Sequence, residues 1–166
     1  MSSFKTITWP FATLGVILSL YALYVEYKIS HKNPDEDEFS ALCDIESIGA
    51  SCSSAFAMPE GKLVSYFGIV PQGHLLDVPN AFIGLVYYTY WLALRPIFPV
   101  PMTAMVSTLA MTASVFLAYK LLVLHELCIL CWSTHIINLR LLLRAYNNVG
   151  ESKEPVLKEP PKIKRI

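Results

Sequence analysis

The chain has 166 residues, of which 54% are hydrophobic and only 16% are charged. Thirteen Lys and Arg residues balance thirteen Asp and Glu residues, so the formal net charge is zero. This composition excludes a disordered chain, because such chains combine low hydrophobicity with high net charge. It also argues against a nucleic-acid-binding protein, since no basic excess is available to neutralise phosphates.

Four apolar stretches follow one another along the chain, at about residues 9–27, 81–100, 102–124 and 127–146. Each approaches the roughly 20 residues that a helix needs to cross a bilayer. A soluble bundle is the alternative, but each of its helices would need a solvated face. Residues 14–25 and 104–119 contain no charged side chain. We therefore predict an all-α fold, a four-helix transmembrane bundle, and a first helix that is retained rather than cleaved as a signal peptide.

The placement of Lys and Arg predicts the orientation of this bundle. Five cations follow the fourth stretch: Lys153, Lys158, Lys162, Lys164 and Arg165. This end should be cytosolic, and an even number of spans puts the N-terminus on the same side. The acid-rich loop at about residues 30–80 is then luminal, between the first and second helices. We expect residues 1–146 to form the membrane domain and residues 147–166 a flexible cytosolic tail.

Four cysteines carry the most specific information. Cys43 and Cys52 lie in the predicted luminal loop, whereas Cys128 and Cys131 form a Cys-Ile-Leu-Cys motif at the start of the fourth helix. Disulfides persist in the lumen, and residues three apart share one face of a helix. A helix N-terminus also stabilises a thiolate. The two pairs could therefore pass two electrons between them by thiol–disulfide exchange.

Two other interpretations of these cysteines are open. Four cysteines could bind structural zinc, but the Cys43–Cys52 spacing suits a zinc knuckle poorly and Cys131 falls inside a predicted membrane helix. A structural four-span protein with a stabilising loop disulfide would leave Cys128 and Cys131 without a role. We therefore expect no metal site, and we expect the four cysteines to be the catalytic groups.

Polar and aromatic side chains near the dithiol could form a substrate site. His135 follows Cys131 by four residues, on the same helical stripe. Asn80 stands at the start of the second helix, where it could simply cap that helix. Both side chains could instead donate hydrogen bonds to two oxygens of a flat lipophilic substrate. Apolar walls could come from four aromatic residues, although such residues often only pack: Phe56, Phe82, Tyr87 and Tyr88.

A set of motifs extends over most of the chain, from about residue 10 to residue 145. In chain order they are Leu42-Cys43-Asp44, Cys52-Ser53-x-x-Phe56, Phe67-Gly68-Ile69-Val70, Asn80, Gly84, Tyr88-Thr89, and Cys128-Ile129-Leu130-Cys131 with Thr134 and Ile137-Asn138. The loop pair, the Asn-x-x-x-Gly and the terminal Cys-x-x-Cys are specific in combination. With them the sequence resembles the vitamin K epoxide reductase family.

The resemblance implies a four-helix transmembrane bundle whose luminal loop caps a quinone pocket. In such an enzyme Cys131 would attack vitamin K quinone or vitamin K 2,3-epoxide, and Cys128 would resolve the adduct. Cys43 and Cys52 would relay electrons from a luminal thioredoxin-like protein, with Cys52 as the exchange partner of Cys128. Asn80 would bind one oxygen of the substrate. The quinone is the substrate of this reaction and not a bound cofactor.

The C-terminal lysines bear on location, and the direction of electron flow stays open. Lys162 and Lys164 resemble a dilysine signal for retention in the endoplasmic reticulum, which works only on the cytosolic side. We expect a multi-pass protein of that membrane, monomeric, with cytosolic termini and a luminal active site. The alternative activity is a disulfide-generating enzyme with the same parts, in which electrons flow from client proteins to a quinone. The sequence does not encode the direction.

Three features depart from the vertebrate members of the family. Eight residues separate Cys43 from Cys52, one more than in the vertebrate enzymes. Residues 58–63 replace a cap segment that contains tryptophan, arginines and glycines, and Ser53 is expected to help lock the cap. His135 stands where the vertebrate enzymes usually have tyrosine, which predicts altered substrate range and altered sensitivity to coumarins.

Overall fold

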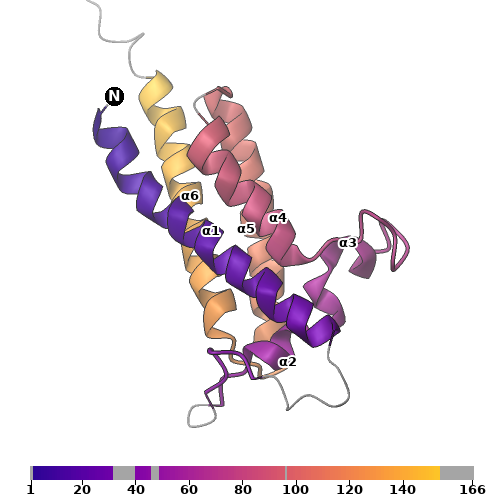
Figure 1. Cartoon of the computed structure of the whole chain (residues 1–166). Helices are drawn as coiled ribbons and strands as arrows, with labels where there is room; N and C mark the ends of the chain where they lie inside the picture. Colours follow the sequence, from indigo (N-terminus) through magenta and orange to yellow (C-terminus); the bar gives the residue numbers. More distant parts are fainter. Residues whose placement is uncertain (1, 32–39, 46–48, 96, 154–166) are drawn as a thin grey trace, which may run out of the picture.

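The computed structural model describes residues 2–31, 40–45, 49–95 and 97–153 (Figure 1). In this part of the chain the regular secondary structure is helical, and β-pairing is limited to isolated bridges. The α-helices are α1 (Ser2–Ser30), α2 (Cys52–Phe56), α3 (Leu63–Tyr66), α4 (Asn80–Thr89), α5 (Val100–Val123) and α6 (Ile129–Lys153). A 3₁₀ turn, η2 (Pro59–Gly61), precedes α3, and a π-helical segment, η3 (Tyr90–Leu94), continues α4. The prediction of an all-α fold is confirmed.

The helix boundaries differ from the predicted ones for local reasons. The second predicted stretch ends early, because α4 passes into η3 and the chain then turns before Pro99. Proline is tolerated in the first turn of a helix, so α5 begins at Val100 with Pro101 inside that turn. α6 continues to Lys153, past the predicted boundary at residue 146. The lysines of the dilysine-like signal and the acidic run at residues 35–38 lie outside the described residues.

The long helices pack side by side (Figure 1). α1 contacts both α4 and α6, and α5 contacts α6. The N-terminal end of α1 and the C-terminal end of α6 lie at the same end of the structure, whereas α2 lies at the opposite end. α2 contacts α1 and α6 there. The loop that follows α1 therefore returns to cover the start of α6.

Two clusters of buried side chains hold these helices together. The first is aromatic and contains Tyr87, Tyr88, Tyr90 and Trp91, packed against small and aliphatic residues of α1, α5 and α6. The second lies where α1, α2 and α6 meet, and it contains Cys52 and Cys128 with aliphatic neighbours from α1 and α6. The cysteines of the loop and of α6 are thus part of the core itself.

Many large apolar side chains point outward from the helices. Ile17 on α1 is 56% exposed and Leu109 on α5 is 64% exposed. Two segments, Thr8–Ser30 and Val100–Val123, are long and apolar enough to cross a membrane. α4 is too short by itself, and the arginines of α6 lower its apolar character. An apolar outer face of this kind is typical of helices surrounded by lipid.

A glycine on α1 permits the close approach of α4. A Cβ atom placed on Gly15 would lie 2.5 Å from the Cδ1 atom of Tyr88, which is itself buried. We expect Gly15→Ala to lower the free energy of unfolding by about 1–3 kcal/mol, the usual cost of overpacking a core. Thermal unfolding of the purified protein in detergent measures this change.

Gly150→Ala is the matched control, because a Cβ atom at Gly150 meets no atom within 4 Å. This variant should be as stable as the parent or more stable, since alanine is favoured over glycine within a helix by about 1 kcal/mol. Equal losses in the two variants would contradict the proposed packing of Gly15 against Tyr88.

Candidate redox and substrate site

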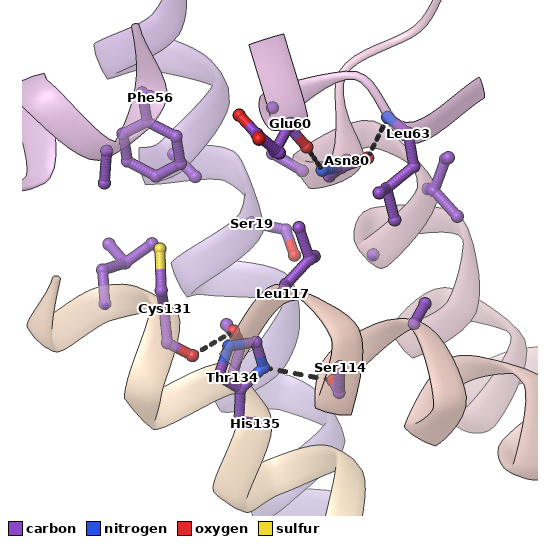
Figure 2. A pocket seen from close by; sticks show the side chains of 18 of the residues that line it. Ser19, Phe56, Glu60, Leu63, Asn80, Ser114, Leu117, Cys131, Thr134 and His135 are labelled. Carbon is purple, nitrogen blue, oxygen red and sulfur yellow. Dashed lines mark hydrogen bonds between the residues drawn. The ribbon is translucent and has the colours of Figure 1, made fainter. Parts of the chain in front are cut away.

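A cavity of about 230 Å³ lies among α1, α4, α5 and α6, beside the segment that contains η2 (Figure 2). Most of its lining is apolar. Cys131 lines it together with five of the six predicted substrate-binding residues: Asn80, His135, Phe56, Tyr87 and Tyr88. The structure does not bring Phe82 to the cavity. Its side chain is 44% exposed, because it projects from a different face of α4 than Gly84 and Tyr88, which are one helical turn apart.

The four sulfur atoms form a path from the loop to the cavity. Cys43 and Cys52 form a disulfide, and Cys128 and Cys131 are free thiols. The Sγ atom of Cys128 lies 3.5 Å from that of Cys52 and 2.7 Å from that of Cys131. Cys52 and Cys128 are fully buried, whereas Cys131 borders the cavity, where Figure 2 shows its sulfur on the side of Phe56. Cys43 is half-buried.

Cys128 occupies the N-cap position of α6. Its carbonyl accepts a hydrogen bond from the backbone N–H of Trp132, at 3.0 Å. Its sulfur accepts one from the backbone N–H of Cys131, at 3.3 Å. The N–H groups in the first turn of a helix favour negative charge, so this position favours the thiolate form that thiol–disulfide exchange requires.

Short backbone contacts attach the loop to the start of α6. The N–H of Ser51 donates to the carbonyl of Leu127, at 2.9 Å, beside a parallel bridge between Ala50 and Leu127. The hydroxyl of Ser54 donates to the Glu126 carboxylate, at 2.8 Å. These bonds place Cys52, which lies between the two serine residues, against Cys128.

The carboxylate of Asp44 organises the loop around Cys52. It accepts hydrogen bonds from the N–H groups of Ala41, Cys52 and Ser53, at 2.8, 2.6 and 3.0 Å. It also accepts one from the hydroxyl of Ser53, at 2.5 Å. Partial burial would raise the pKa of Asp44, but these hydrogen bonds outweigh burial and hold the pKa below its usual value. Ser53, which was expected to help lock the cap, donates hydrogen bonds to this carboxylate within the loop.

Asn80 does not cap α4 with its side chain. The N-cap residue is Pro79, and no side-chain capping bond is made there. The Asn80 side chain instead reaches η2 and the first residue of α3: Nδ2 donates to the carbonyl of Glu60, at 2.6 Å, and Oδ1 accepts from the N–H of Leu63, at 2.9 Å (Figure 2). An amide nitrogen carries two hydrogens, so one donor of Asn80 remains for a ligand in the cavity.

An ion pair joins the same segment to α5. The Nζ atom of Lys120 lies 3.1 Å from Oε1 of Glu60, and it also lies 5.1 Å from the centre of the Tyr66 ring. Both charged side chains border the cavity. Partial burial would raise the pKa of Glu60, but hydrogen bonds from its own backbone N–H and from Lys120 lower it. Sequence reasoning assigned Lys120 no role, although the available signal was its position as the one charged residue in the apolar stretch 102–124.

His135 belongs to a polar group on another side of the cavity. Its Nδ1 atom lies 3.2 Å from Oγ of Ser114 (Figure 2), and Nδ2 of Asn138 donates to the same oxygen, at 2.6 Å. Sequence reasoning included Asn138 among the family motifs but assigned it no role, and it missed Ser114. Ser107 and Ser114, seven residues apart and both buried, were the detectable sign of a polar inner face on α5.

Comparisons with known proteins identify relatives of this chain. The sequence profile described as the vitamin K epoxide reductase family matches residues 7–146. Vitamin K epoxide reductase complex subunit 1 of Mus musculus is 32% identical over 147 residues, which are 84% of this chain and 86% of the mouse protein. The protein of the same name from Rattus norvegicus is 31% identical over 147 residues, with the same coverage of both chains.

The bonds to Asp44 predict an acid-sensitive contribution to stability. Asp44→Asn should lower the free energy of unfolding by about 1 kcal/mol at neutral pH, because three N–H groups lose a charged acceptor. A carboxylate whose pKa is depressed by folding stabilises the protein above its unfolded-state pKa of about 4, and this contribution is lost as the pH falls through the lower, folded-state pKa.

The difference in stability between the parent protein and the variant should therefore shrink in strong acid. Thermal melts of both proteins across a pH series measure it. A difference that stays constant below the unfolded-state pKa would show that the charge of Asp44 contributes nothing.

Proposed function

The chain belongs to the vitamin K epoxide reductase family, and on that premise we propose that it reduces vitamin K 2,3-epoxide and/or vitamin K quinone, forming the hydroquinone, with the four cysteines as its redox groups. The observation that carries this proposal is the path of sulfurs that begins at the Cys43–Cys52 disulfide and ends with Cys131 at the wall of an apolar cavity. A static loop disulfide would leave the free thiols of Cys128 and Cys131 unexplained.

The cavity-side pair carries out the reduction. The Cys131 thiolate attacks the substrate ring and forms an S–C bond. Cys128 then attacks the Cys131 sulfur, so that an S–S bond forms, the S–C bond breaks and its electron pair passes to the substrate. Two electrons and two protons from the two thiols convert a quinone to the hydroquinone, or an epoxide to the quinone and one water. Cys128 is within reach for this step, at 2.7 Å from Cys131.

The loop pair restores the dithiol. A reduced Cys52 attacks Cys128 in the Cys128–Cys131 disulfide, and Cys43 then attacks Cys52, which leaves a Cys43–Cys52 disulfide and two free thiols in α6 and its cap. The structure has the cysteines in this same state, with 3.5 Å between the sulfurs of Cys52 and Cys128. A luminal thioredoxin-like protein would reduce the loop disulfide again at Cys43, which is the more accessible of the two sulfurs.

The substrate ring would bind between two hydrogen-bond donors. Asn80 has one amide hydrogen left for a substrate oxygen, and His135 borders the cavity on another side. Phe56, Tyr87 and Tyr88 supply aromatic walls. An apolar pocket with few polar anchors is the usual form of a site for such a ligand.

The membrane arrangement follows from the same proposal. Four helical segments, α1, α4 with η3, α5 and α6, would span the membrane of the endoplasmic reticulum in a monomer. The segment between α1 and α4 would form the luminal cap. The outward apolar side chains of α1 and α5 support contact with lipid, and the cations at the end of the chain support cytosolic termini.

Cysteine variants test the relay. Cys128→Ala and Cys131→Ala should abolish turnover with any reductant, because each removes one of the two electron-donating sulfurs. Cys43→Ala and Cys52→Ala should lose activity with a thioredoxin-like protein as reductant, yet keep most of it with a small dithiol that reduces Cys128 and Cys131 directly. Assays of vitamin K epoxide and of vitamin K quinone reduction, run in parallel, provide the measurement.

The comparison between the two reductants is the internal control. If Cys128→Ala and Cys131→Ala both retained the parent rate, the mechanism would be wrong. If the loop variants lost activity equally with both reductants, their cysteines would serve folding rather than electron relay.

The position of His135 predicts the response to inhibitors. His135→Tyr should strengthen inhibition by 4-hydroxycoumarins by about tenfold, the value of one added hydrogen bond, since tyrosine carries a donor that reaches further into the cavity. The inhibitor concentration that halves activity measures this effect. Ile136→Tyr is the matched control, because Ile136 is exposed on the outer surface of α6. Unchanged inhibition of His135→Tyr would mean that this position does not contact the inhibitor.

A further inference from the structure

Four polar side chains from three helices form a continuous chain of hydrogen bonds at the cavity. The hydroxyl of Tyr88 on α4 donates to Oδ1 of Asn138 on α6, at 2.8 Å. Nδ2 of Asn138 donates to Oγ of Ser114 on α5, at 2.6 Å. Oγ of Ser114 lies 3.2 Å from Nδ1 of His135 on α6. All four side chains line the cavity.

The chemistry of each group determines which atom donates and which accepts in each of these hydrogen bonds. A carbonyl oxygen only accepts, so the phenol of Tyr88 donates to Asn138, and the amide of Asn138 then presents its nitrogen to Ser114. The Ser114 oxygen is therefore already an acceptor. A longer contact of 3.5 Å between Tyr88 and the carbonyl of Thr134 is at the limit for a hydrogen bond.

The single hydroxyl hydrogen of Ser114 is available for donation to His135. Thr108 and Thr112, on the same helix, donate their hydroxyl hydrogens to the backbone carbonyls four residues earlier. In the described part of the chain Ser114 makes no such bond, and its oxygen contacts Nδ1 of His135, which can accept the hydrogen. A neutral imidazole that accepts at Nδ1 carries its hydrogen on Nε2.

The Nε2 atom of His135 has no hydrogen-bond partner among the residues that the structure describes. It is buried and makes no hydrogen bond to any described residue, and the His135 side chain as a whole is only 9% exposed. The ring meets Trp132 edge-on, with 5.9 Å between ring centres and 85° between planes. A buried N–H group without a partner lowers the stability of the fold. This nitrogen is therefore a place where an acceptor atom of a ligand would satisfy a donor.

We propose that the chain Tyr88–Asn138–Ser114 fixes His135 as a neutral, Nε2-protonated donor for one oxygen of the bound quinone or epoxide. This inference rests on the proposed function for the identity of the ligand. Ser114 and Asn138 are then positioning residues that act through His135. Because the fixed group is a donor, the site favours a ligand with an acceptor oxygen at this place, which the oxidised ring provides.

The tautomer can be observed directly. The chain has four histidines, so the protein labelled with ¹⁵N-histidine gives few ring signals, and the signals missing from His135→Gln identify those of His135. We expect the ring nitrogen shifts of a neutral imidazole protonated at Nε2. Shifts of the Nδ1-protonated form, or of a charged imidazolium, would overturn the proposal. This measurement needs no turnover, so it separates a failure of the hydrogen-bond chain from a failure of the proposed enzymatic activity.

A double-mutant cycle tests whether Ser114 acts through His135. Ser114→Ala should weaken the binding of vitamin K quinone by about tenfold, as the loss of one hydrogen bond predicts, and Ser114→Thr should restore it. In a His135→Phe background the same Ser114→Ala change should have no further effect. Quenching of tryptophan fluorescence by the quinone measures binding. Equal losses in both backgrounds would show that Ser114 has a separate structural role and would contradict the proposal.

A pair of histidine replacements locates the donor. The amide nitrogen of glutamine can occupy the place of Nε2, whereas that of asparagine reaches only the place of Nδ1. His135→Gln should therefore keep most of the quinone affinity, and His135→Asn should lose it by about tenfold. The reverse order would place the ligand contact at Nδ1 and would overturn the inference.

Discussion

The position of one sulfur atom, that of Cys128, is the constraint on which the rest of the structure depends. It must lie near Cys131 on one side and near Cys52 on the other, at 2.7 and 3.5 Å. The cap of α6 satisfies the first requirement, since residues at N-cap and N3 adjoin. The second is harder, because Cys52 is distant in sequence. The Ala50–Leu127 bridge and the carboxylate of Asp44 hold the loop where that contact is possible.

The cavity combines an apolar interior with two separate polar contacts. Asn80 is held by Glu60 and Leu63, on the segment that covers the cavity, and His135 is held by Ser114. Each of these side chains is thus oriented by a neighbour before any ligand enters. Prior orientation lowers the entropy cost of binding, so rigid polar contacts can give specificity in a small cavity whose walls are otherwise apolar.

Sequence reasoning located groups whose neighbours are close in the chain. It failed for groups whose neighbours are distant in sequence and meet only in the folded structure. The Cys-x-x-Cys pair and His135 follow from helical spacing, and the helices themselves follow from apolar runs. Phe82 lies away from the cavity lining. Between Asn80 and Thr89 the residues of α4 are all apolar or aromatic, so the sequence did not reveal which face of the helix is inward. Asn80 was taken for a possible helix cap, since Glu60 and Leu63 approach it only through the folded loop. Ser114 lay in an apolar stretch, and its spacing of seven residues from Ser107 was the one sign of its role that the sequence offered.

The short helix α2 has a consequence for the energetics of the whole molecule. α2 begins at Cys52, in the disulfide, and ends at Phe56, in the cavity wall. Five residues therefore connect the electron-carrying pair with the space that a ligand occupies. By thermodynamic linkage, a ligand that binds more tightly to one oxidation state of the loop must shift the midpoint potential of that disulfide by the same free energy. For such a ligand, the occupancy of the cavity and the midpoint potential of the loop disulfide would be coupled.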